Sequence, residues 1–110
     1  MTRGPKTAAA IDEAAAVCSG AGLQVLPIGG KHKSADLLVM GTGRVRLIRV
    51  RRPHTLLKDP DAVARRYCRE ISHLRELPAS DCLEKELMLL QPGKTWLTFR
   101  ILPESILVKE

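Results

Sequence analysis

The chain has very few aromatic residues, with one Trp, one Tyr and one Phe among 110 residues. Proteins that bind single-stranded nucleic acid without sequence preference stack bases on aromatic side chains, so this class is disfavoured. No apolar run approaches the ~18 residues of a membrane-spanning helix, and the first ten residues lack the apolar core of a secretory signal. These absences predict a cytoplasmic protein without a membrane partner.

Cysteine is also scarce: Cys18, Cys68 and Cys82 are far apart and form no Cys-x-x-Cys pair. An odd, scattered set argues against a disulfide framework or a zinc site. We expect small buried residues or unreactive thiols at these positions. The three histidines likewise lack the spacing of metal ligands.

Acidic residues are few in the middle of the chain. From Lys31 to Arg75 there are twelve Lys and Arg residues and four Asp and Glu residues, whereas the remainder holds six basic and eight acidic residues. The whole excess of positive charge, +6 for the chain, therefore falls in this middle segment. Clustered positive charge favours a polyanionic partner, because phosphates that are neutralised release their condensed counterions. A lipid surface is disfavoured, since no amphipathic helix with large apolar residues accompanies the charge.

The first half of the sequence predicts one helix and three strands. After a basic tail at residues 1–6, Thr7 is the expected N-cap of a helix over residues 8–21. Strands are expected at residues 23–28, 35–40 and 45–50. The last two strands flank Gly-Thr-Gly-Arg, which predicts a hairpin.

The second half predicts a long helix and two further strands. The helix is expected from Asp59 or Asp61 to about Leu77, with an inward stripe of Val63, Tyr67, Ile71 and Leu74. Strands follow at residues 86–91 and 96–101, with a short tail at residues 103–109. The expected fold is α/β, a single domain in the order α-β-β-β-α-β-β with helices flanking a mixed sheet.

The hairpin brings one acidic residue next to arginines. With Thr42 and Gly43 at the tip, Met40 lies opposite Val45 and Asp36 lies opposite Arg49. Alternation along the second strand places Arg49 and Arg51 on the same face as Asp36. An acid at the start of one strand thus meets two residues at the end of the next, which is the geometry that holds the ion in a metal-dependent nuclease.

The stretch GGKHKSADLLVMGTGRVRLIRVRRP, residues 29–53, resembles the core of the restriction-endonuclease-like superfamily. The signature of that superfamily is an Asp followed on the next strand by Glu-x-Lys. The resemblance is closest to archaeal Holliday junction resolvases and covers residues 7–107. It rests on the leading helix that ends in glycine before a strand, the Gly- and Ser-containing loop before the acid, and the late aromatic strand. It implies a nuclease-type domain that acts on DNA in recombination, as a homodimer.

Within this resemblance the catalytic residues are replaced. The family's acid aligns with Asp36, but its Glu-x-Lys falls on Arg49-Val50-Arg51. Arginine has no lone pair for a cation and stays protonated. At about 5 Å and an effective dielectric constant near 20, each guanidinium repels a unit positive charge by roughly 3 kcal/mol. We therefore expect a degenerate site that holds no metal or other cofactor, with Asp36 in an ion pair with Arg49.

One alternative keeps a metal site. Some relatives take the second acid from the following helix, where Glu70, Asp59 and Asp61 are candidates that the spacing does not separate. In that case Asp36 and an acid such as Glu70 would bind Mg²⁺, and the protein would be a structure-specific endodeoxyribonuclease.

The residues expected to contact nucleic acid are basic or lie in the glycine-containing loop, which suits phosphate binding. They are Lys31, Lys33, Ser34, Arg44, Arg46, Arg49, Arg51, Arg52, Arg65, Arg66 and Arg69. The preferred interpretation is a non-catalytic protein that binds duplex or branched DNA through its backbone. A second alternative is a non-catalytic subunit whose arginines meet an acidic protein partner.

Overall fold

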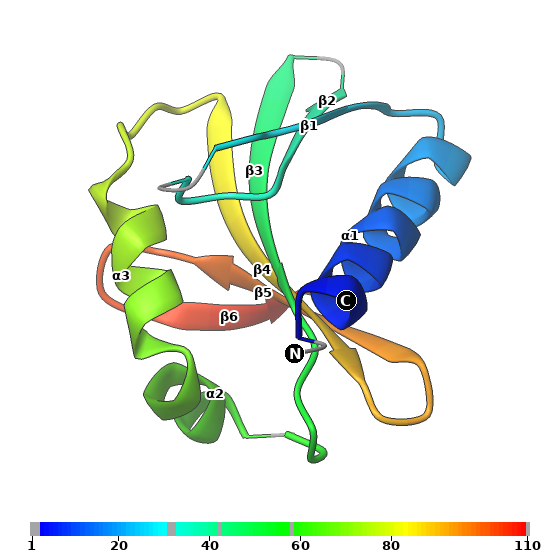
Figure 1. The fold of residues 1–110 in the computed structure, drawn as a ribbon. Coiled ribbons are helices and arrows are strands. Elements are labelled where there is room, and N and C mark those ends of the chain that lie inside the picture. Colours follow the sequence, from blue (N-terminus) through cyan, green and yellow to red (C-terminus); the bar gives the residue numbers. More distant parts are fainter. Residues whose placement is uncertain (1–2, 31–32, 42, 58, 110) are drawn as a thin grey trace.

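The computed structural model describes residues 3–30, 33–41, 43–57 and 59–109, with side chains from residue 8 onward. One six-stranded mixed sheet runs in the order β1-β2-β3-β4-β5-β6. Figure 1 shows helix α1 on one side of the sheet, with α2 and α3 on the other. The α/β class and the mixed sheet between helices are as the sequence predicts. No helix in the described ranges is long and apolar enough to span a membrane.

The N-terminal helix α1 spans Arg3–Gly20, so it begins earlier than the expected N-cap at Thr7. Ala10, Ala14 and Cys18 form its buried face. Gly22 follows with a φ of 85°, a left-handed conformation that glycine adopts without strain and that commonly ends a helix. Strand β1, Gln24–Pro27, then forms one edge of the sheet, where the missing N–H of Pro27 is tolerated.

The predicted hairpin is confirmed. Strand β2 spans Leu37–Gly41 and strand β3 spans Arg44–Arg51. They pair antiparallel with Met40 opposite Val45, in the predicted register, although the predicted tip residue Thr42 lies outside the described residues. Asp36 immediately precedes β2 and continues this register by donating its N–H to the carbonyl of Ile48 at 2.8 Å.

The single long helix predicted for residues 59–77 is wrong: α2, Pro60–Arg66, and α3, Cys68–Glu76, are separate helices. The break is at Tyr67, with φ −112° and ψ 32°. Asp59 caps α2 through a hydrogen bond from the N–H of Asp61. The predicted inward stripe is nevertheless confirmed, because Val63, Tyr67, Ile71 and Leu74 are all buried.

The C-terminal half contains one strand more than predicted. Strand β4, Leu83–Gln91, begins three residues before the predicted position because it pairs parallel with β3 from Val45 and Leu83 onward. Strand β5, Thr95–Ile101, is antiparallel to β4. The predicted tail instead forms β6, Ile106–Lys109, which pairs with β5 and forms the second edge of the sheet.

Two hydrophobic clusters lie on opposite faces of the sheet. The cluster beneath α1 contains Ile48 and Val50 of β3, with Trp96 packed at its border. The cluster beneath α2 and α3 contains Leu87, Leu89 and Phe99. The odd-numbered residues near the end of β3 therefore face α3, and the even-numbered residues face α1. This alternation decides which arginines can share a site.

Candidate nucleic-acid interface

The carboxylate of Asp36 is the centre of a charged cluster at the C-terminal end of β3. Asp36 is 2% exposed. Its Oδ2 accepts a hydrogen bond from the backbone N–H of Val50 at 2.8 Å. Asp36 lies directly before Leu37, the first residue of β2. The carboxylate thus extends the β2–β3 ladder by one acceptor, which is a structural reason for its position.

Two basic side chains share the other oxygen of Asp36. Lys33 Nζ lies 3.1 Å from Oδ1, and Arg49 Nη1 lies 3.4 Å from the same atom. Arg49 Nη1 also donates to the backbone carbonyl of Lys33 at 3.2 Å. The predicted ion pair between Asp36 and Arg49 is therefore present, and it fastens the loop before β2 to the end of β3.

Arg51 lies between two carboxylates. Its Nη1 is 3.8 Å from Asp36 Oδ2, and its Nε donates to Glu70 Oε2 on α3 at 3.1 Å. Its Nη1 also donates to the carbonyl of Val50 at 3.0 Å. Of the three acids considered for a rearranged metal site, Glu70 shares this arginine with Asp36.

The electrostatic environment of Arg49 is unfavourable for its charge. Burial lowers the pKa of the Arg49 guanidinium from its ordinary value, and neighbouring Arg51 lowers it further, whereas Asp36 and Glu70 raise it. Three cations, Lys33, Arg49 and Arg51, face two acids, which leaves the cluster with one excess positive charge. An anion added here is attracted, and a cation is repelled.

A divalent metal ion does not fit these residues. Both oxygens of Asp36 already accept contacts from an N–H or a cationic group, and Arg51 separates Asp36 from Glu70. Within the described ranges, His, Cys, Asp and Glu side chains nowhere gather in groups of three that could hold a metal ion. Mg²⁺ requires oxygen ligands and would approach three fixed positive charges.

Arg44 and Arg46 lie on the other face of the sheet, so the five arginines of β3 and its end do not form one groove. Arg44 Nη1 lies 2.6 Å from Glu84 Oε2, and Arg46 Nε lies 3.7 Å from Glu86 Oε1. Arg46 also donates to the sulfur of Cys18 on α1 at 3.6 Å. Both arginines are thus paired with acids of β4, on the face that α1 covers.

Four other residues predicted to contact nucleic acid are exposed arginines. They lie close in the sequence to Arg51 or to Glu70. Arg52 directly follows β3, Arg65 and Arg66 end α2, and Arg69 lies in the first turn of α3. Within the ranges the structure describes, none of the four forms an ion pair; the nearest aromatic contact places Arg66 6.0 Å from the centre of the Tyr67 ring. These charges are available to a ligand from solvent.

The loop before Asp36 is partly described. Lys33 Nζ donates to the carbonyl of Ile28 at 3.2 Å as well as pairing with Asp36. Ser34 is half-buried and lines a hollow of about 330 Å³ together with Lys33. The predicted phosphate contact Lys31 lies outside the described residues.

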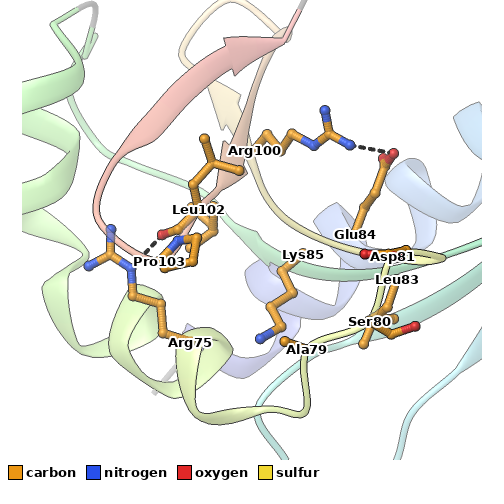
Figure 2. A pocket seen from close by; sticks show the side chains of 11 residues that line it. Arg75, Ala79, Ser80, Asp81, Leu83, Glu84, Lys85, Arg100, Leu102 and Pro103 are labelled. Atoms are coloured by element: carbon orange, nitrogen blue, oxygen red, sulfur yellow. Dashed lines mark hydrogen bonds and ion pairs between the residues drawn. The ribbon is translucent and has the colours of Figure 1, made fainter.

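A larger cavity of about 450 Å³ lies between the end of α3, the start of β4 and the turn after β5. Its basic side chains are directed apart (Figure 2). Arg75 donates to the carbonyl of Leu102 at 2.9 Å, Lys85 donates to the carbonyl of Leu77 at 2.6 Å, and Arg100 pairs with Glu84. These contacts fasten the turns around the cavity, so we do not assign it a ligand.

Sequence reasoning missed the charged network of β4 to β6. Glu86 is 1% exposed and pairs with Lys109 on β6, and Glu84 accepts from both Arg44 and Arg100. A signal was present, since Glu84-x-Glu86 and Arg44-x-Arg46 have the same two-residue spacing and opposite charge. The parallel pairing of β3 with β4 was not predicted, so the sequence did not show that these opposite charges meet.

No known protein-family model matches the sequence, and no curated protein matches it either. The structure does have a counterpart: this chain has the α/β fold of the Holliday junction resolvases, the restriction-endonuclease-like fold predicted above. One solved structure that is similar is that of Hjc, a Holliday junction resolvase from the archaeal hyperthermophile Archaeoglobus fulgidus. The TM-score is 0.66 at 15% sequence identity, over 94% of this chain and 87% of the resolvase chain. At this identity the likeness establishes the fold alone.

Proposed function

We propose that the protein binds duplex or branched DNA on a resolvase-like fold and does not cleave it with a metal ion. The observation that carries this proposal is the enclosure of Asp36 by Lys33, Arg49 and Arg51. In the resemblance drawn from the sequence, the position of Arg49 belongs to a glutamate that binds metal. A site of the opposite charge suits the phosphate backbone of DNA.

Salt dependence tests DNA binding directly. If about five phosphates are neutralised, the logarithm of the association constant should fall against the logarithm of salt concentration with a slope of about −4 to −5. The measurement is fluorescence anisotropy with a labelled four-way junction and with the same sequence as duplex. A flat salt response, or affinity no higher than that of an unrelated basic protein, contradicts the proposal and favours the acidic protein partner instead.

We also propose a homodimer, which rests on the resemblance to the resolvases and on the small size of the chain. Two-fold symmetry would match the symmetry of a four-way junction. Sedimentation velocity of the free protein and of the complex gives the two masses. A monomer on the junction contradicts this part of the proposal.

A second candidate function is cleavage with a rearranged metal site. It is favoured by one observation: Asp36 and Glu70 reach the same guanidinium, so displacement of Arg51 would bring two carboxylates to one cation. Incubation of junction DNA with Mg²⁺ or Mn²⁺ separates the two functions. Cleavage that disappears in Asp36→Ala overturns the non-catalytic proposal.

A further inference from the structure

Among the residues that the structure describes, the Asp36 cluster leaves three guanidinium nitrogens without an acceptor. Arg49 uses Nη1, and Arg51 uses Nε and Nη1, in the contacts given above. Within the described part of the chain, Arg49 Nε and Nη2 and Arg51 Nη2 have no acceptor. None of them is among the described buried atoms that lack a partner, and the side chains of Arg49 and Arg51 are 13% and 24% exposed.

Glu70 controls the direction of Arg51. A guanidinium is planar, and its donors keep a fixed mutual geometry. With Nε held by Glu70 and Nη1 held by Asp36 and the carbonyl of Val50, the remaining Nη2 points in one direction. Glu70 is itself 20% exposed at its side chain, so it lies at the border of the cluster and not in the core.

Resting on the proposed function above, we propose that Arg49 and Arg51 form a phosphodiester-binding site that needs no divalent cation, and that Glu70 positions Arg51 in it. The positive charge that a metal ion would supply comes from the side chains themselves. A phosphodiester carries one negative charge and two free oxygens, which match the excess charge of the cluster and the donors that have no acceptor among the described residues.

Glu70 has two opposite effects on the binding of such a ligand. Like Asp36 it carries negative charge, which by Coulomb repulsion alone would weaken the binding of DNA. A positioning role for Glu70 has the opposite consequence, because without it the guanidinium of Arg51 loses its fixed direction. Removal of Glu70 should therefore tighten DNA binding if charge repulsion dominates, and weaken it if Glu70 positions Arg51.

The test is anisotropy with duplex and junction DNA in EDTA, over a range of salt concentrations, for the intact chain. We expect Glu70→Ala to weaken binding about fivefold. The matched control is Glu76→Ala, which removes an exposed acid of the same helix and should leave binding unchanged or tighter. Weaker binding of Glu70→Ala with the control unaffected supports the inference, whereas tighter binding of both overturns it.

Substitutions of Arg51 provide a second readout. Arg51→Gln should reduce the magnitude of the salt slope by about one, and Arg51→Lys should keep the slope while weakening binding. Thermal melting establishes that each variant is folded. A wild-type slope in folded Arg51→Gln overturns the inference but leaves the proposed function intact.

The ligand chemistry is tested apart from DNA with inorganic phosphate and dimethyl phosphate, each followed through the arginine Nε–Hε resonances in NMR spectra. Shifts of Arg49 and Arg51 with both probes support a phosphodiester site, and shifts with inorganic phosphate alone indicate a site for the free ion and overturn it. If the wild type does not bind DNA, the proposed function fails, and these shifts still decide the inference. Absence of shifts with either probe overturns it.

Discussion

Asp36 accepts a hydrogen bond from the backbone N–H of Val50 at 2.8 Å, although the two residues belong to neighbouring chain segments rather than to one turn. The carboxylate takes the place of a strand carbonyl at the end of the ladder between β2 and β3. Asp36, which the sequence resemblance led us to expect at the position of a metal ligand, therefore has a structural role in this fold.

Asp36→Ala should lower the free energy of unfolding by about 2–4 kcal/mol, because it leaves the N–H of Val50 unpaired and removes the counterion of Lys33, Arg49 and Arg51. Asp36→Asn keeps an acceptor for Val50 and should cost less. Urea denaturation gives both values. An Asp36→Ala variant as stable as the wild type shows that the carboxylate does not support the fold.

Substitution of arginines on the two faces of the sheet should affect DNA binding differently. Arg66→Gln removes an exposed charge without a counterion among the described residues, and should reduce the magnitude of the salt slope by about one. Arg44→Gln removes a charge that is paired with Glu84, and should change the slope less. Equal changes in the two variants indicate that both faces contact DNA.

Arg49→Glu with Arg51→Lys introduces the Glu-x-Lys of the superfamily that the sequence resembles. Replacing the guanidinium of Arg49 by a carboxylate and that of Arg51 by an ammonium beside Asp36 should create affinity for Mn²⁺, measured by calorimetry and as a rise in melting temperature. Metal-dependent cleavage by this variant supports the loss of an ancestral site. Arg52→Glu makes the same charge change at an exposed position and should not respond to Mn²⁺. If the double variant unfolds, Arg49 is needed for the fold.

Tyr67 should make stability depend on pH in the alkaline range. Burial raises the pKa of the Tyr67 hydroxyl from its ordinary value of 10.0, although Arg66 opposes the shift. The folded state then keeps a proton that the unfolded state loses, so the free energy of unfolding should fall as pH rises above about 10. Since Tyr67 is the only tyrosine, tyrosinate absorbance reports it alone. A titration midpoint equal to that in urea contradicts this expectation, and Tyr67→Phe should remove the slope.

Local patterns were sufficient for most of the fold. The hairpin register followed from a glycine turn between β-rich runs, and the inward stripe of the second helical region followed from its spacing. The break at Tyr67 could not be predicted, since the helix ends there without proline or glycine and the buried ring packs into a cluster formed by distant strands. Strand β6 was missed because it is defined by its pairing with β5, which the sequence of the tail alone does not show.

The candidate site was predicted in part. The contact of Asp36 with Arg49 follows from hairpin pairing, whereas the contact of Arg51 with Glu70 joins a strand to a helix nineteen residues away. Arg44 and Arg46 were predicted to share one basic groove with Arg49 and Arg51, but the structure pairs them with acids of β4. Their pairing with Glu84 and Glu86 depends on the parallel register of β3 with β4, which local sequence does not encode.

At Arg49 and Arg51, β3 pairs parallel with β4, and the N–H of Val50 between them donates to Asp36, whereas the antiparallel pairing with β2 ends at Ile48. The backbone of β3 at Arg49 and Arg51 is therefore ordered before any ligand arrives. Side chains that are already held in one rotamer lose little conformational entropy when they bind. Two arginines built on a central strand can thus recognise an anion with less entropic cost than the same two residues on a loop.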